Sequence, residues 1–455
     1  MHANQLRVMT MTKALRFSRL AATIVCLAAN TPFALSAQVG MTVPKQSQPI
    51  ALRGATIHTV TKGVIQNGTI IFDAGKIIAV GANIAIPAGT KIVDVTGKHI
   101  YPGLIDAYSS VGISEIGAVD MSNDVNEVGD FNPNVHTDVA VNAESRHIGT
   151  TRSQGVLTTI TTPGGGLISG MSSAMSLEGW SWEEMSLESA AALNVNWPDP
   201  ASRGGRFGGF GGQPGGTRQT YEERVRQLKD YFAEARAYRD ALAAGEKVRT
   251  DARYAAMIPA LNGKIPVVVS ANGTSQINDA ITWAKQEKLR LIIRGGDDAI
   301  FVADRLKAEN IPVILTSTMD APNRDYDGYD AVYSRAAQLY KKGIKFVISG
   351  GSGALYSDRL PYEAGVAVAF GLPEEEAIKA VTINAAELMG LADRLGSLEP
   401  GKQATLLITT GTPIDTRSNI LQAYIQGREL DMNDIQKHFF MKYMEKIKQM
   451  MKIIS

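Results

Sequence analysis

Residues 98–107 read Lys-His-Ile-Tyr-Pro-Gly-Leu-Ile-Asp-Ala and mark the point at which the sequence changes its pattern. From Ile50 to Gly97 the chain consists of short β-branched runs and turns without helical periodicity. After the quoted stretch, short apolar runs alternate with amphipathic stretches. The predicted strands are His99–Ile105, Val156–Thr161, Ile265–Val269, Leu289–Ile293, Ile311–Leu315 and Ile344–Ile348. The predicted helices are Tyr221–Leu242, Ser275–Gln286, Ala299–Lys307, Ala331–Lys341 and Glu374–Val381.

This alternation predicts an α/β fold with a parallel sheet, and the length of the region favours a (β/α)8 TIM-type barrel. A β pattern returns near the end of the chain, at Ala404–Ile408 and Ala423–Ile425. We therefore expect the two ends to form one small β-sandwich beside the barrel. The predicted division is a signal peptide (1–37), a linker (38–49), a composite β-sandwich (50–98 and 396–432), the barrel (99–395) and a C-terminal helix (433–455).

The overall composition excludes several classes of protein. The 455 residues include 46 Lys+Arg, 45 Asp+Glu, six His and one Cys, so the chain has no basic surplus for binding nucleic acid. A single cysteine excludes both a disulfide framework and a zinc site built from cysteines. The chain therefore has the composition of an ordinary globular protein.

The first residues have the order of a secretory signal peptide. Lys13, Arg16 and Arg19 precede an apolar run, Leu20–Leu27, and small residues follow up to Ala37. This order favours a cleaved leader over a buried N-terminal helix, and the bulky residue before Cys26 disfavours lipidation there. We expect an exported, periplasmic protein that keeps no cysteine and inserts no segment into a membrane after the leader is removed.

Two further segments have unusual composition. Residues 202–217 are glycine-rich but lack the preceding strand and the Lys-Ser/Thr pair of a phosphate-binding P-loop, which favours a surface loop. Residues 438–454 predict a helix with a basic surplus and mixed hydrophobicity. For this helix the sequence leaves two alternatives, of which packing against the rest of the chain is favoured over contact with a membrane.

Several motifs together resemble those of the amidohydrolase superfamily, in its imidazolonepropionase-like branch. Residues 98–107 resemble the PGLIDAHxH strand that opens the barrel in that family. Further matching segments are Leu360–Ala364, Ala369–Pro373, Thr382–Ala386, Leu395–Lys402 and Ile425–Arg428. The resemblance covers nearly the whole chain after the leader. It implies a barrel with a composite β domain and a metal-dependent hydrolase acting on carbon–nitrogen bonds other than peptide bonds.

The positions of the family's metal ligands carry other residues here. The resemblance implies zinc or another divalent metal held by the two histidines of HxH, two more histidines on middle strands and a late aspartate. The corresponding residues are Tyr108, Ser110, Ser270 and Gly351, and no histidine ends the strand before Gly295. Hydroxyl groups and glycine do not replace imidazole and carboxylate as zinc ligands. We therefore predict a degenerate metal site and no bound cofactor.

The remaining histidines offer one alternative site. His136 and His147 follow the first barrel strand in a segment rich in aspartate, where a carboxylate and histidine site for a hard cation is an alternative to a covering loop. His58, His99 and His438 are expected to be structural. A serine nucleophile needs a histidine base, and no histidine is expected near the serines at the barrel mouth. No catalytic residue is therefore assigned.

The sequence thus leaves two hypotheses for function. The first is an exported hydrolase with a metal-free or relocated-metal mechanism. The second is a non-catalytic barrel that binds a ligand or pairs with an active, histidine-complete paralogue. In both cases a small molecule is the expected ligand, a homodimer is the default assembly, and the predicted binding residues are Tyr108, Asn126, Asn272 and Arg294.

Overall fold

The computed structural model describes residues 42–454 apart from 201–218, 323, 326 and 352. The predicted signal peptide and the glycine-rich segment lie outside the described residues. Among the described residues, no helix combines the length and the apolar character needed to cross a membrane.

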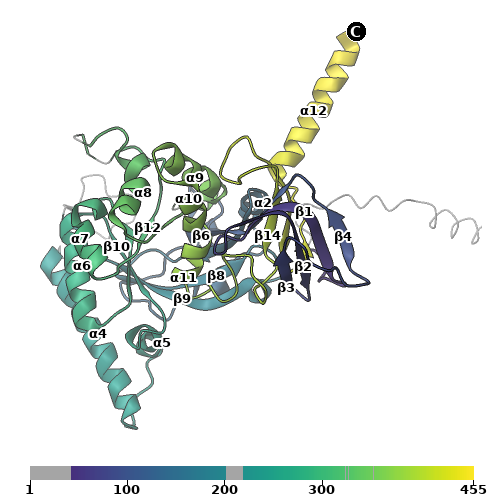
Figure 1. Cartoon of the computed structure of the whole chain (residues 1–455). Helices are drawn as coiled ribbons and strands as arrows, with labels where there is room; N and C mark the ends of the chain where they lie inside the picture. The colour runs from purple at the N-terminus through teal and green to yellow at the C-terminus, as the bar shows by residue number, and fades with distance from the viewer. Residues whose placement is uncertain (1–41, 201–218, 323, 326, 352, 455) are drawn as a thin grey trace, which may run out of the picture. The chain divides into compact units, whose positions relative to one another are not determined.

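Strands from both ends of the chain form one eight-stranded sheet, called here the terminal sheet (Figure 1). Its strand order is β16-β15-β14-β5-β1-β2-β3, and β4 pairs with β1. The N-terminal strands are β1 (Ile50–His58), β2 (Val64–Asp73), β3 (Lys76–Gly81), β4 (Lys91–Asp94) and β5 (His99–Pro102). The C-terminal strands are β14 (Leu406–Thr409), β15 (Ile420–Ile425) and β16 (Arg428–Glu429). The antiparallel pairing of β14 with β5 joins the two groups.

The strand expected over His99–Ile105 is in fact two strands that belong to different sheets. β5 lies in the terminal sheet, whereas β6 (Leu104–Ser109) begins the barrel. Gly103 separates them, and a Cβ atom there would lie 2.7 Å from the Leu157 side chain. Glycine lets the backbone pass this close to Leu157 as the chain leaves the terminal sheet and enters the barrel. The apolar run looks continuous in the sequence and therefore does not reveal the break between the two strands.

The second eight-stranded sheet is the barrel, which confirms the predicted fold class. Its strands follow β6 in sequence order, and β13 lies beside β6 at the closing seam. They are β7 (Val156–Thr161), β8 (Ile168–Ser176), β9 (Ser186–Asn196), β10 (Val267–Ala271), β11 (Leu291–Gly295), β12 (Val313–Leu315) and β13 (Phe346–Ile348).

One barrel strand departs from the parallel pattern. β8 is antiparallel to both β7 and β9, whereas the other neighbouring pairs are parallel. The connections on either side of β8 are too short for the crossover helix that parallel strands need, and the second holds only α3 (Trp182–Met185). All of β8 is buried, but it was not predicted because it is rich in serine and poor in the β-branched residues typical of strands.

Helices cover the outside of the barrel. Those near the start and middle are α2 (Arg146–Ser153), α4 (Tyr221–Ala243), α5 (Ala252–Leu261), α6 (Thr274–Glu287), α7 (Ala303–Ala308) and α8 (Ala331–Lys342). The later ones are α9 (Leu360–Ala369) and α10 (Glu374–Ala380). α11 (Ile383–Leu388) differs, because its Ala385, Ala386 and Leu388 belong to the core inside the barrel. Short 3-10 turns are η1 (Asp120–Ser122), η2 (Thr137–Ala140), η3 (Ala299–Val302) and η4 (Ala354–Arg359). α4 begins where Thr220 and Glu223 form a reciprocal capping box.

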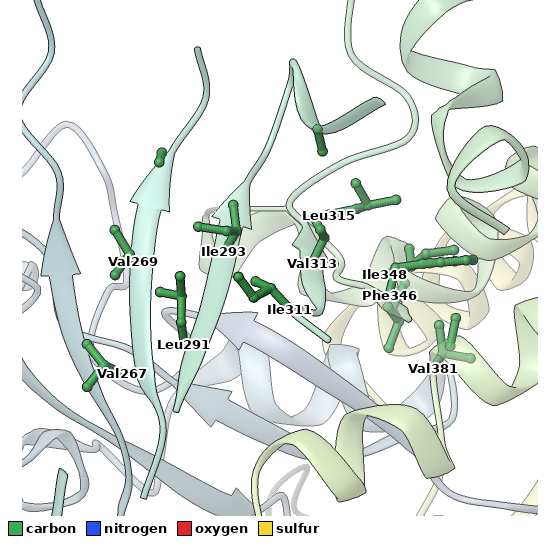
Figure 2. Close-up of a cluster of buried hydrophobic side chains, with 14 of the residues drawn as sticks. Val267, Val269, Leu291, Ile293, Ile311, Val313, Leu315, Phe346, Ile348 and Val381 are labelled. Atoms are coloured by element: carbon green, nitrogen blue, oxygen red, sulfur yellow. The ribbon is translucent and has the colours of Figure 1, made fainter. Parts of the chain in front are cut away.

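Alternate residues of the parallel strands face two separate cores. Val267 and Val269 of β10 belong to the outer core beneath the helices, part of which Figure 2 shows across β10 to β13. Val268, between them, belongs to the core inside the barrel. Because both faces of these strands are buried, their sequences read as continuous apolar runs. This alternation also fixes which residues at the strand ends point into the barrel.

The C-terminal helix α12 (Ile435–Ile454) is the element whose environment was predicted wrongly. Its start is capped, because the buried Asp434 side chain accepts hydrogen bonds from the backbone N–H groups of Gln436 and Lys437, both at 2.8 Å. From His438 to Met451, however, every residue is exposed. The favoured prediction that this helix packs against the rest of the chain is therefore wrong beyond its first turn.

Two of the histidines expected to be structural form a contact in the terminal sheet. His58 Nε2 lies 3.0 Å from His99 Nδ1, and the His58 ring stacks on Tyr101 with centroids 4.0 Å apart. Burial, with the charge of His99 as a smaller cause, lowers the pKa of His58 from 6.5 to about 4. The folded state thus favours neutral His58, so this contribution to stability is present above pH 6.5 and is lost as the pH falls towards 4.

We expect the variant His58→Phe to lose less stability in acid than the unmodified protein. Phenylalanine keeps the stacking on Tyr101 but carries no group that titrates as the pH falls. The free energy of unfolding, measured by denaturant titration at neutral pH and near pH 4, should therefore fall less steeply in the variant. Equal falls in the two proteins would contradict this role of His58.

Candidate functional site

Three polar side chains form one layer inside the barrel, at the carboxyl ends of its strands. Ser270 of β10 pairs in register with Asn196 of β9 on one side and Arg294 of β11 on the other. Val268 and Ile292, two residues earlier, belong to the core inside the barrel. Because side chains alternate along a strand, Ser270 and Arg294 continue this inward face. The layer therefore lies directly above the apolar barrel interior.

Arg294 is the cation of this layer, and it is only 5% exposed. Its Nη2 donates a hydrogen bond to Asn196 Oδ1 at 3.1 Å, and its guanidinium carbon lies 4.4 Å from the centre of the Tyr108 ring. Its Nη1 is buried and makes no hydrogen bond with the described residues. Burial lowers the pKa of Arg294. None of the ion pairs found among the described residues includes this arginine.

A buried guanidinium is normally compensated by a carboxylate, because removing the charge from water costs several kcal/mol. At Arg294 the described neighbours supply an aromatic face and an amide oxygen instead. Both stabilise a cation, but neither neutralises it. The arrangement therefore fits an anionic group of a ligand that would accept a hydrogen bond from Nη1.

Asp106 is a second buried group near the first barrel strand, and the sequence analysis overlooked it. It is fully buried, and its Oδ1 accepts hydrogen bonds from the backbone N–H groups of Tyr108 and Gly350, both at 3.2 Å. Its Oδ2 has no partner among the described residues. Burial raises the pKa of Asp106 to about 8, so it holds a proton at neutral pH. Its hydrogen bonds tie β6 to the end of β13 and so fix the backbone that carries Tyr108.

Glu363 is a third buried acid that was not predicted. Its carboxylate accepts hydrogen bonds from the Thr318 hydroxyl at 2.8 Å and from Ser317 Oγ at 3.2 Å. Burial raises the pKa of Glu363, although the bonds from Thr318 and Ser317 oppose this shift. The contacts fasten the loop after β12 to the first turn of α9. Glu363 is thus a positioning group for the barrel rim.

The predicted binding residues are only partly brought together. Tyr108 and Arg294 are in contact, as described above. Asn126 is exposed on the loop after β6, where it forms a bridge with Gly164. Asn272 lines a cavity of about 750 Å³ whose walls also include Arg324. The contact between Tyr108 and Arg294 makes them the centre of the candidate site, and Asn196 joins them as a residue that the sequence analysis missed.

The residues at the predicted metal-ligand positions do not fit a metal held as in the resembling family. Ser110 is buried, Ser270 is half-buried, and Gly351 has φ of 103°, a left-handed conformation that favours glycine. A phenol, two hydroxyls and a glycine provide no imidazole or carboxylate. In the part of the chain that the structure describes, no group of three or more His, Cys, Asp or Glu side chains is placed to hold a metal ion.

The alternative site at His136 and His147 likewise gains no support from the side-chain contacts. His136 Nδ1 lies 3.0 Å from Ser189 Oγ, on β9. His147 Nε2 lies 2.9 Å from the carbonyl oxygen of Glu115. The two rings thus hold different parts of the long segment after β6 in place. Such contacts fit a loop that covers the barrel better than a metal site.

Comparison with known proteins finds similarity to amidohydrolases. Residues 330–451 match the family model described as the amidohydrolase family. The crystal structure of an amidohydrolase from Thermotoga maritima MSB8 superimposes with a TM-score of 0.76 at 27% sequence identity, covering 84% of this chain and 99% of that chain.

Curated relatives match over shorter parts of their length. An imidazolonepropionase from Syntrophobacter fumaroxidans is 34% identical over 98 residues, which are 21% of this chain and 22% of the relative. An amidohydrolase from Hapsidospora irregularis is 21% identical over 373 residues, which are 75% of this chain and 37% of the relative. The aligned parts therefore span less than half of either relative.

Proposed function

The chain belongs to the amidohydrolase superfamily, in its imidazolonepropionase-like branch, and from this premise we propose that it is an exported hydrolase of carbon–nitrogen bonds other than peptide bonds. Its substrate is a small molecule with an anionic group, held at the carboxyl ends of the barrel strands. The reaction uses water to break the bond between a carbonyl carbon and a nitrogen, and it proceeds without the family's set of metal ligands.

The observation that carries this proposal is the uncompensated charge of Arg294. A carboxylate that accepts a hydrogen bond from Nη1 would satisfy the orphaned donor and neutralise the buried cation. Tyr108 would cover one side of the guanidinium, while Asn196 holds Nη2 and keeps the planar group in one orientation. These contacts support an anion site of fixed geometry at the place where members of this superfamily bind their substrates.

A second candidate function rests on the chemistry of the ligand positions. Tyr108, Ser110, Ser270 and Gly351 supply neither a strong metal site nor a histidine base, whereas the residues that shape the fold are retained. This contrast favours a non-catalytic barrel that binds the same anionic ligand, alone or as the partner of a histidine-complete paralogue. The two candidates share the ligand site and differ only in whether the bond is broken.

The experiment uses the purified protein with pairs of N-acyl amino acids and their uncharged methyl amides. Release of amine measures hydrolysis, calorimetry measures binding, and elemental analysis measures the metal content. We expect the acids to be preferred over the amides, and Arg294→Met to weaken this preference about 10- to 100-fold because one charged hydrogen bond is lost.

The outcomes separate the two candidates. Hydrolysis with the expected preference supports the hydrolase, and binding of the acids without hydrolysis supports the non-catalytic barrel. Near-stoichiometric zinc together with hydrolysis that a chelator abolishes would contradict the metal-independent mechanism. If neither acids nor amides bind, the anion site at Arg294 is wrong.

The proposal also includes the location of the protein and its assembly. The order of charged, apolar and small residues before Gln38 supports cleavage there and a periplasmic location. N-terminal sequencing of protein recovered from the periplasm tests this directly, because an uncleaved N-terminus contradicts it. For assembly we propose a homodimer or a pair with an active paralogue, which light scattering and co-purification distinguish.

A further inference from the structure

The exposed helix α12 separates its apolar and charged side chains onto two faces. At about 100° per residue, seven large apolar side chains fall within one arc of about 140°. They are Phe439, Phe440, Tyr443, Met444, Ile447, Met450 and Met451, each between 38% and 66% exposed. Beyond the first turn no charged residue falls within this arc. We call it the apolar face of α12.

The opposite face is basic. Over residues 435–451 the helix carries Lys437, Lys442, Lys446 and Lys448 but only one acid, Glu445, which gives a net charge of +3. Lys437 and Lys446 border the apolar face on its two sides, and Glu445 lies among the other polar residues on the far side. Long lysine side chains at such borders can place their stems along an apolar surface while the ammonium groups stay in water.

From these two faces we infer that α12 is a membrane-surface anchor, which lies flat on a bilayer containing anionic lipids. The apolar side chains would enter the boundary between head groups and acyl chains, and Lys446 would contact lipid phosphates, whereas Lys437 already pairs with Asp434 at 3.6 Å. The helix does not cross the bilayer, in agreement with the lack of a membrane-spanning helix among the described residues. The buried Asp434 caps the start of this anchor by accepting hydrogen bonds from backbone N–H groups of its first turn.

The charge pattern favours this occupant over a second copy of the chain. If two α12 helices paired along their apolar faces, the bordering lysines of both copies would flank the same seam. Stable helix pairs usually place opposite charges at these flanking positions. Here the single glutamate lies on the far side, so the lysines would repel one another, whereas an anionic surface would attract all of them.

The test is sedimentation of the purified full chain with vesicles. One set contains phosphatidylglycerol and phosphatidylethanolamine, and the other contains only phosphatidylcholine. We expect stronger binding to the anionic set, which Lys446→Gln weakens about fivefold. Met451→Ser should weaken it about tenfold, because a large apolar side chain no longer enters the bilayer.

The matched control is Met441→Ser. Met441 and Met451 are both 66% exposed, but Met441 lies on the basic face. Its replacement should leave vesicle binding unchanged, and unchanged circular dichroism will show that the variants fold. Equal effects of the two methionine variants, or equal binding to the two vesicle sets, would overturn the proposal. So would a dimer that Met451→Ser dissociates in a protein that binds neither vesicle set.

Discussion

Replacing Glu178 with alanine is expected to lower the free energy of unfolding by about 3–5 kcal/mol, because it leaves a buried arginine without its charge partner. Glu178 forms an ion pair with Arg152, and the two side chains are only 2% and 8% exposed. Glu178 Oε1 also accepts a hydrogen bond from the backbone N–H of Val43 at 2.8 Å. Denaturant titration of Glu178→Ala measures the loss.

An exposed ion pair supplies the control for this prediction. Glu429 pairs with Lys91 at 3.1 Å, but both side chains are nearly half exposed. Glu429→Ala should therefore change the free energy of unfolding by less than about 1 kcal/mol. The double variant Arg152→Met with Glu178→Leu should recover much of the stability lost in Glu178→Ala, since it removes both charges. Equal losses in the buried and exposed variants would contradict the argument from burial.

Replacing Arg294 with methionine is expected to have the opposite effect and to raise the free energy of unfolding by about 1–4 kcal/mol. Methionine fills most of the same space without a buried charge or an orphaned Nη1 donor. The lost hydrogen bond to Asn196 offsets this gain by only about 1 kcal/mol. If removing Arg294 stabilises the protein, Arg294 is kept for binding and not for stability, since residues of active sites often reduce the stability of the fold.

Arg335 provides a matched control. It is also buried, at 9% exposed, but it forms an ion pair with Asp297 at 2.8 Å. Arg335→Met should destabilise the protein, because Asp297 loses this ion pair. Opposite signs for the two arginine variants would show that Arg294 lacks an internal counter-charge. A loss of stability in Arg294→Met would instead assign it a structural role and remove the main support for the anion site.

The fold could be predicted from the sequence where local pattern and tertiary environment agree. The apolar runs of β10 to β13 and the amphipathic stretches of α4, α6 and α8 were confirmed, because strands buried on both faces and helices on the outside leave distinct patterns. β8 was missed because it is rich in buried serines, such as Ser172 and Ser173, which bond to distant residues, and poor in the β-branched residues that mark a strand. The environment of α12 was predicted wrongly because an amphipathic pattern shows which side of a helix is apolar but not what lies against that side.

The candidate site was predicted less completely, and for a different physical reason. Tyr108 was found because it stands at the first histidine position of the HxH motif in the resembling family, and Arg294 because it directly follows a predicted strand. Asn196 was missed together with the strand that carries it. Asp106 was visible as a lone acid in an apolar run, yet only the structure shows its burial and its hydrogen bond to Gly350. Such contacts join residues far apart in the sequence, so local pattern does not reveal them.

The passage of one continuous run from the terminal sheet into the barrel has a consequence for the order of folding. β5 finds its partner β14 only after about 300 further residues have been made. At about 5–20 residues per second, this delay is on the order of 15–60 s. During this time the edge of β5 is open to pairing with other chains. The nascent chain is therefore most exposed to aggregation before its last strands emerge, when a chaperone that shields β5 would protect it.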